Sequence, residues 1–146
     1  MFAIACLPEI NWNSFLLVFV VLHFMLYPAS NGYNSYFDKD EGSIGGVRQP
    51  PKVSRELHSV SWFLDLLAIA IGWTVSWYFA LMLLVYGLVS KAYSHPAIRL
   101  KKRPILGWLT AGVFQGYFTF LMVFVGMGFQ DMLFETNIQW AALLST

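Results

Sequence analysis

The stretch LHSVSWFLDLLAIAIGWTVSWYFALMLLVYGLVS, residues 57–90, decides the fold class of this chain. It is largely apolar, and at about 1.5 Å per residue it is too long for one helix across a hydrocarbon core of roughly 30 Å. Two helices of near-minimal length fit it better, and Gly72 is the natural place for the turn between them. We therefore expect a tight membrane hairpin, with helices at about residues 57–71 and 74–91.

The composition of the whole chain indicates the same class. Of its 146 residues, 58% are hydrophobic and 12% are charged, whereas soluble domains have about 45–50% apolar and about 25% charged residues. Further apolar runs cover about residues 10–30 and 105–127, and a shorter one occupies residues 137–146. We predict an all-α, polytopic membrane helical bundle of about four full helices, with partial helices at both ends. A net charge of +1 gives no indication of a nucleic-acid partner.

The positive charges are confined to two segments, which predicts the topology. All nine Lys and Arg lie between Lys39 and Arg55 or between Lys91 and Arg103. If the apolar stretch between these segments were one span, the two basic loops would face opposite sides, against the positive-inside rule. The hairpin instead places both predicted loops, residues 31–56 and 92–104, in the cytoplasm.

The polar residues that follow the first apolar run share one helical face if the helix continues past Pro28. At 100° per residue this face contains His23, Tyr27, Asn31, Asn34, Asp38 and Glu41. Carboxylates one turn apart beside a basic loop provide hard oxygen ligands for Mg²⁺, which commonly binds one or two carboxylates, water and substrate phosphates. The alternative interpretation is a solvated acidic cluster at the membrane surface.

The second basic loop has the complementary chemistry. It contains five cations within residues 91–103, beside Tyr93 and Ser94. Guanidinium groups bind phosphate bidentately, and ammonium groups add a point charge, so the segment suits a diphosphate. An ordinary positive-inside loop would have a similar charge, and composition leaves both interpretations open.

Two motifs in these loops resemble those of the UbiA superfamily of intramembrane prenyltransferases. The segment NSYFDKDE, residues 34–41, resembles its first aspartate-rich motif, N-D-x-x-D-x-x-x-D, with Asn34 and Asp38 in matching positions. Ser35 replaces the usual acid, and Gly42 replaces the last aspartate. The segment YSHPAIRLK, residues 93–101, resembles the Y-S-x-P-P-x-R/K-L-K segment of homogentisate prenyltransferases and chlorophyll synthases, with alanine for the second proline.

The resemblance implies transfer of an isoprenoid chain from a prenyl diphosphate to a hydrophobic acceptor, aromatic in many relatives, within the membrane. Its cofactor would be Mg²⁺. The site residues that it implies are the metal ligands Asn34, Asp38, Asp40 and Glu41, the catalytic residues Asp38, Arg99 and Lys101, and the substrate-binding residues Asn31, Asn34, Arg48, Lys91, Tyr93 and Ser94. Glu41 is favoured over Asp40 because it lies on the helical face of Asp38.

The resemblance covers residues 1–146 but only about half of a UbiA-type enzyme, since the second aspartate-rich motif is absent from this sequence. We therefore expect a partial UbiA-like domain, a fragment that need not be active alone, in the bacterial inner membrane. Asp131 and Glu135 have one-turn spacing, but the predicted topology puts them in a solvated connection outside. A non-catalytic membrane scaffold or a small transporter is the alternative function, because the same apolar runs and basic loops would serve it.

One acid within the apolar hairpin needs a separate explanation. Asp65 is predicted at membrane depth, where an ionisable side chain is a candidate for function. The alternative is a structural one, in which Asp65 makes a polar contact between helices.

Overall fold

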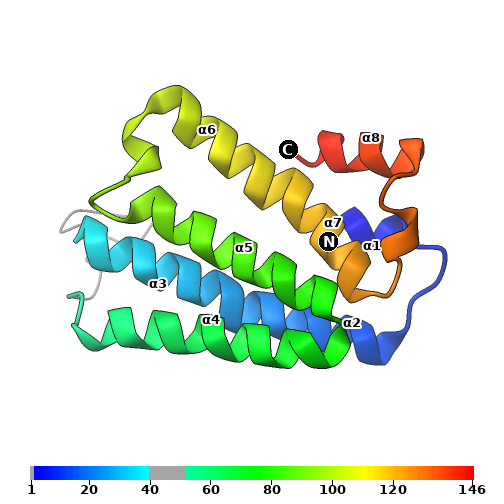
Figure 1. Cartoon of the computed structure of the whole chain (residues 1–146), viewed down its shortest axis with the longest axis horizontal. Coiled ribbons are helices and arrows are strands. Elements are labelled where there is room, and N and C mark those ends of the chain that lie inside the picture. The colour runs from blue at the N-terminus through cyan, green and yellow to red at the C-terminus, as the bar shows by residue number, and fades with distance from the viewer. Residues whose placement is uncertain (1, 40–51) are drawn as a thin grey trace.

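The computed structural model describes residues 2–39 and 52–146, and these residues form helices and connections without a strand (Figure 1). The helices are α1 (Phe2–Ala5), α2 (Trp12–Val20), α3 (Tyr27–Asp38), α4 (Glu56–Val75), α5 (Trp77–Ser94), α6 (Pro104–Gly112), α7 (Thr119–Gly126) and α8 (Thr136–Leu144). Two π-helical turns, η1 (Val21–Leu26) and η3 (Val113–Phe118), join α2 to α3 and α6 to α7, so that each pair forms one continuous helix. Two 3₁₀ turns complete the fold, η2 (Leu100–Lys102) and η4 (Gln130–Met132).

Three of these helices are long and apolar enough to cross a membrane: Trp12–Asp38, Glu56–Val75 and Pro104–Gly126. Helix α5 lies among them and has 18 residues, a length of about 27 Å at 1.5 Å per residue. Large apolar side chains such as Phe63, Leu66 and Trp73 are more than 60% exposed, as expected of helices that face lipid. The predicted all-α membrane bundle is confirmed.

The first long helix extends farther than residue 30, where the predicted loop 31–56 was to begin. It continues through Pro28 and ends at Asp38. Pro28 cannot donate a backbone hydrogen bond, and its ring crowds the carbonyl of the preceding turn. The π-helical turn η1 lies directly before it, with Tyr27 N–H bonded to the Leu22 carbonyl, and this wider turn accommodates the proline. The polar face from Asn31 to Asp38 is therefore helical.

The hairpin reverses at Ser76, so the prediction of a turn at Gly72 is wrong. Ser76 is the single residue between α4 and α5, with extended φ and ψ of −163° and 153°. Its Oγ accepts the Phe79 N–H at 3.0 Å, which caps α5. Gly72 stays within α4, where a Cβ would clash with Leu83 Cδ1. Glycine serves here for close helix packing rather than for the turn.

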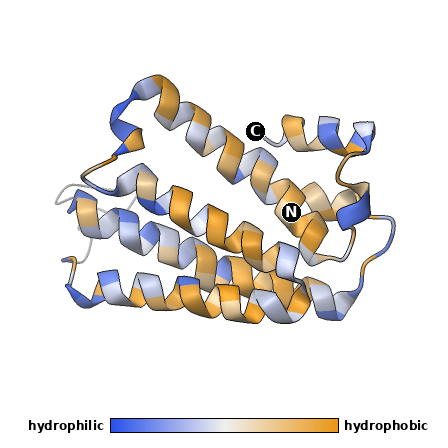
Figure 2. Ribbon diagram, in the orientation of Figure 1, coloured by the Kyte–Doolittle hydropathy of each residue, from blue (hydrophilic) through white to orange (hydrophobic). Residues whose placement is uncertain are grey.

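The hairpin brings the ends of four helices together at one end of the bundle. Helices α3 and α5 run in the same direction and α4 runs opposite to both, so α3 and α5 end where α4 and α6 begin (Figure 1). Apolar residues dominate the middle of the long helices. Strongly hydrophilic residues lie where α3 ends and where α4 and α6 begin (Figure 2). The two predicted motif loops are thus neighbours, while η4, which contains Asp131, lies at the other end of the molecule (Figure 1).

The core that holds this arrangement is made by the α2–α3 helix, the hairpin and α7. Its buried members include Leu26, Phe79, Leu83, Met122 and Val125. Phe79 and Leu83 also lie against Gly72, and Phe79 lies 3.0 Å from the Cβ position at Gly126. The start of α5 is therefore packed between α4 and α7, and this packing sets the direction of the helix toward its polar end.

Replacing Ser76 by alanine is expected to lower the free energy of unfolding by about 1 kcal/mol, because the α5 N-terminus loses its side-chain cap. Reversible unfolding in mixed micelles measures this change. Ser59→Ala is the matched control, since Ser59 is exposed within α4. An equal effect of the two substitutions would contradict the capping role.

Candidate functional site

The two motif segments meet in a cluster of polar side chains at the shared end of α3, α5 and η2. Asn34 Oδ1 accepts hydrogen bonds from Ser94 Oγ at 2.5 Å and from Lys101 Nζ at 2.9 Å. Lys101 also forms an ion pair with Asp38 Oδ1, and Arg99 Nη2 lies 3.8 Å from the same oxygen. Five predicted site residues, two from the first motif and three from the second, therefore form one contact network.

The register between α3 and α5 makes this contact possible. Ser30 and Ser90 share a hydrogen bond of 2.5 Å, and Asn34 and Ser94 form the equivalent contact one turn farther along both helices. Because the two helices are parallel, a spacing of four residues on one matches four residues on the other. These two polar contacts between α3 and α5 thus position Asn34 against the second motif.

The loop after α5 folds back so that Lys101 reaches Asn34. His95 has a β conformation, as the residue before a proline prefers, and it ends the helix. Arg99 has a φ of 44°, in the left-handed region, which a non-glycine residue adopts at a cost of about 1–3 kcal/mol. The 3₁₀ turn η2 then packs closely against Gly107 of α6, where a Cβ would lie 3.1 Å from Lys101 Cα.

The charges of the cluster are partly removed from solvent. The side chains of Asp38 and Lys101 are 16% and 17% exposed, and that of Arg99 is 32% exposed. Among the described residues of the cluster, two cations face one carboxylate, so this part of it has an excess of positive charge. Together with the Ser94 hydroxyl and the Asn34 amide, this excess suits a polyanionic ligand.

The other predicted site residues have different positions. Asn31, Tyr93 and Ser94 line a cavity of about 110 Å³ that also reaches Asn34. Three predicted residues lie outside the residues that the structure describes: Asp40, Glu41 and Arg48.

Lys91, expected to bind substrate, is turned away from the cluster. It is buried and forms an ion pair with Asp65 of α4; each side chain is 6% exposed. Its ammonium group also lies 5.0 Å from the Tyr33 ring and 5.1 Å from the Trp62 ring. Lys91 and Tyr33 contact residues of α4, whereas the serines and Asn34 contact one another between α3 and α5. Asp65 therefore makes a polar contact between helices, which was the structural one of its two interpretations.

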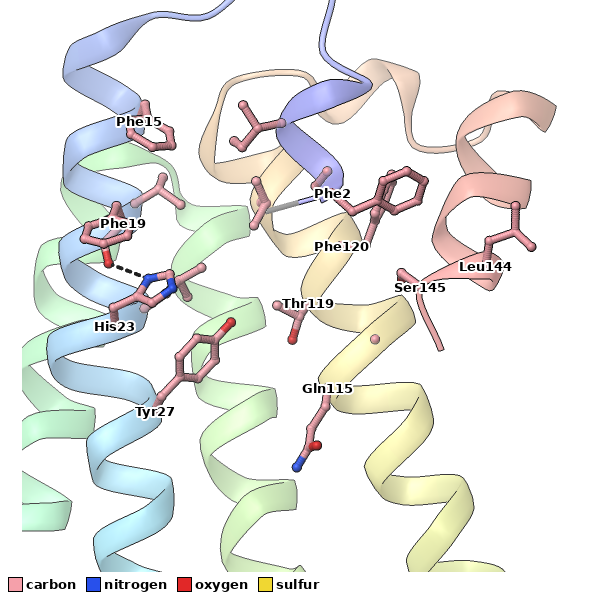
Figure 3. Close-up of a pocket in the computed structure, with 16 residues that line it drawn as sticks. Phe2, Phe15, Phe19, His23, Tyr27, Gln115, Thr119, Phe120, Leu144 and Ser145 are labelled. Atoms are coloured by element: carbon pink, nitrogen blue, oxygen red, sulfur yellow. Dashed lines mark hydrogen bonds between the residues drawn. The ribbon is translucent and has the colours of Figure 1, made fainter. Parts of the chain in front are cut away.

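Two larger cavities, which motif analysis did not identify, continue from the cluster toward the middle of the bundle. The first, about 410 Å³, is lined by Tyr27, Ser30, Asn31, Tyr86 and Gln115. The second, about 390 Å³, shares Tyr27 and Gln115 with it and is otherwise rich in phenylalanine (Figure 3). The sequence signal for it is a ladder of rings at four-residue spacing along the first long helix, Phe15, Phe19, His23 and Tyr27.

These features define a class: a helical membrane protein with a polar site of paired acids and cations at one end of its bundle and an aromatic-lined cavity beneath it. The chain matches the model of the UbiA prenyltransferase family over residues 1–146, and it belongs to that family. Searches of curated proteins and of solved structures find no match. Membership supports a prenyltransferase-type function in general, and the details of substrate and site are proposals.

Replacing Lys91 by methionine is expected to lower the free energy of unfolding by about 3–5 kcal/mol, because a buried carboxylate loses its partner. The double variant Lys91→Met/Asp65→Leu should recover most of this loss, since no unpaired charge remains. Unfolding in mixed micelles measures both. Lys102→Met is the control, because Lys102 is exposed in the same basic segment. Equal stability of the single and double variants would contradict the pairing.

The register of α3 against α5 can be tested by a disulfide between positions 30 and 90. With Cys6 changed to serine, the pair Ser30→Cys/Ser90→Cys should form an intramolecular disulfide under mild oxidation, detected by mass spectrometry after alkylation. The pair Ser14→Cys/Ser90→Cys should stay reduced, because Ser14 lies roughly 24 Å from Ser30 along the same helix. Oxidation of both pairs, or of neither, would rule out this register.

Proposed function

We propose that this chain contributes a prenyl-diphosphate site to an intramembrane transfer of an isoprenoid chain onto a hydrophobic, ring-bearing acceptor. The contact between the Asn34/Asp38 motif and the Arg99/Lys101 motif carries this proposal. It brings oxygen ligands and phosphate-binding cations together at the end of a membrane bundle. A scaffold or a transporter has no need for this pairing.

The oxygens of the cluster fit a magnesium ion. Asn34 Oδ1 and Asp38 Oδ1 both accept a hydrogen bond from the Lys101 ammonium group, so the two oxygens face the same positive charge. An amide oxygen and a carboxylate oxygen are hard ligands, and Mg²⁺ usually completes its shell with water and substrate phosphate. Residues 2–39 and 52–146 contain no group of three or more His, Cys, Asp or Glu side chains that could hold a metal. Asp40 and Glu41 are the further candidates.

The reaction requires the bond between C1 of the prenyl group and the diphosphate oxygen to break. The electron pair leaves on that oxygen, a ring carbon of the acceptor forms the new bond to C1, and the ring then loses a proton. The chemistry that Mg²⁺ supplies in such a site is neutralisation of negative charge on the diphosphate. Arg99 and Lys101 would bind the same oxygens, so that the charge of the leaving group is stabilised as it develops.

The cavities beneath the cluster fit the remainder of the substrate. The phenylalanine-rich cavity offers apolar walls for an isoprenoid tail, and Phe15, Phe19 and Phe120 are among its lining residues. Aromatic faces also attract a developing allylic cation. Exclusion of water matters because water would capture such a cation before the acceptor could.

Replacing Asp38 by asparagine is expected to reduce magnesium-dependent prenyl transfer by about 100-fold or more, since the site loses its charged ligand. Transfer is measured with radiolabelled prenyl diphosphate in nanodiscs that contain the full-length protein. Asp131→Asn, at the other end of the bundle, is the matched control and should retain activity. Undiminished transfer by the Asp38→Asn variant would refute the proposed site.

A further inference from the structure

His95 holds the turn that begins the second motif loop. Helix α5 ends directly before it, and its imidazole Nδ1 accepts the Ala97 backbone N–H at 3.2 Å. Its carbonyl oxygen accepts the next two backbone N–H groups, those of Ile98 at 3.1 Å and Arg99 at 2.8 Å. One residue therefore binds three successive N–H groups, in the way that a capping residue does at the start of a helix. The short turn from Pro96 to Ile98 depends on these bonds.

This turn determines where the two cations of the polar cluster lie. Arg99, with its left-handed φ of 44°, directly follows the turn, and the 3₁₀ turn η2, which contains Lys101, comes next. A left-handed φ is unfavourable for arginine, so the contacts around it must stabilise it. The N–H bond from Arg99 to His95 is one such contact, and the ion pair with Asp38 is another. Both cations follow the turn in the chain, so opening it would move them away from Asn34 and Asp38.

The hydrogen bond from Ala97 fixes the protonation state of His95. A backbone N–H can only donate, so Nδ1 of His95 has no proton and Nε2 carries the one proton of a neutral imidazole. His23 has the opposite arrangement: its Nδ1 lies 3.0 Å from the Phe19 carbonyl, which only accepts, so Nδ1 carries the proton there. A second proton on His95 would place an N–H against the N–H of Ala97. The turn and the added proton therefore compete for one lone pair.

The surroundings of His95 contain a second imidazole. The His95 ring lies 5.5 Å from the Phe37 ring of α3, and His58 of α4 lies 6.1 Å from that same ring. Within residues 2–39 and 52–146, no carboxylate forms an ion pair with His95. His58 needs its own control, because its charge can also change near neutral pH. The other ionisable side chains in contact at this end of the bundle are Tyr36 of α3 and Asp38 with its partners Arg99 and Lys101.

We propose that His95 is a positioning residue for the two cations of the polar cluster and makes their position sensitive to pH. The inference rests on the proposed function for the identity of the ligand that these cations bind. With a neutral imidazole the turn forms, and Arg99 and Lys101 are held beside Asn34 and Asp38. A protonated His95 no longer accepts the first N–H of the turn, and the left-handed Arg99 loses its support. The arrangement is therefore present above the range in which imidazole titrates, roughly pH 5–8, and is lost as the pH falls through it.

The position of the loop can be measured as a distance between two spin labels. Ser59→Cys and Lys102→Cys provide exposed sites on α4 and η2, in the full-length protein in nanodiscs with its other cysteines replaced. With His95 present, the distance distribution should be narrow at pH 8 and broad at pH 5. His95→Asn should stay narrow at both, because an asparagine oxygen accepts the N–H two residues on and does not titrate. His95→Leu, which has no acceptor, should be broad at both.

Three controls separate this role from a general effect on the fold. His58→Asn should keep the full pH dependence. A label pair at Asn13→Cys and Ser59→Cys reports on the bundle and should give one distance at both pH values, which excludes unfolding. Nitrogen NMR of histidine-labelled protein at pH 8 should show the Nε2–H tautomer for the signal that His95→Asn removes.

Four outcomes would overturn the inference. They are a narrow distribution at pH 5 with His95 present, a broad one at pH 5 in His95→Asn, a narrow one at pH 8 in His95→Leu, and an Nδ1–H tautomer of His95 at pH 8.

Binding of inorganic pyrophosphate with Mg²⁺ tests the consequence for the site. From pH 8 to pH 5, the affinity of wild type relative to His95→Asn should fall about tenfold or more, because the ligand loses charge-assisted hydrogen bonds. The comparison cancels the titration of pyrophosphate itself. An unchanged ratio would contradict the positioning role. If neither protein binds pyrophosphate at pH 8, the proposed function fails, while the label distances still decide whether His95 holds the loop.

Discussion

The parallel packing of α3 against α5 is the constraint on which the polar site depends. Neither helix contains a complete site, and each contributes a hydroxyl or amide at every turn of the shared contact. The bonds Ser30–Ser90 and Asn34–Ser94 hold the register within one residue. A shift of one residue would rotate Ser94 by about 100° and remove it from Asn34. The loop that carries Arg99 and Lys101 begins directly after Ser94, so its position depends on the same register.

The buried pair Lys91–Asp65 joins α5 to α4 next to these contacts. An ion pair in an apolar interior gains little net stability, because both charges must be desolvated. What it provides is direction: one ammonium group contacts α4 through Asp65 and Trp62 and α3 through Tyr33. Three helices therefore meet at a single side chain, one residue along α5 from Ser90.

The two π-helical turns lie beside the cavities beneath the site. Tyr27, which lines two of these cavities, directly follows η1, and Gln115, which also lines them, lies within η3. The first turn also lets the helix pass Pro28, which carries Asn34 and Asp38 to its far end. The same local irregularity thus serves both the polar cluster and the cavity.

Much of the architecture could be predicted because the bilayer imposes simple rules. Apolar run length predicted an all-helical membrane bundle, and the distribution of Lys and Arg predicted that both motif loops lie at one end. The resemblance of the two motifs to those of UbiA enzymes implied Asn34, Asp38, Ser94, Arg99 and Lys101, and these residue types suit a diphosphate. These features depend on residues close together in sequence and on a solvent that permits few alternatives.

Details that depend on contacts between helices could not be predicted. Gly72 suggested a turn because glycine is permissive, yet its missing side chain is used to let α5 approach, and a serine cap reverses the chain instead. Lys91 suggested phosphate binding because it lies beside the basic loop, but the direction of its side chain depends on where α4 places Asp65. The chain's own pattern thus specified membrane helices and two complementary motifs. Helix register and rotation then selected the side chains that meet, because a turn of 100° per residue separates neighbours in sequence onto different faces.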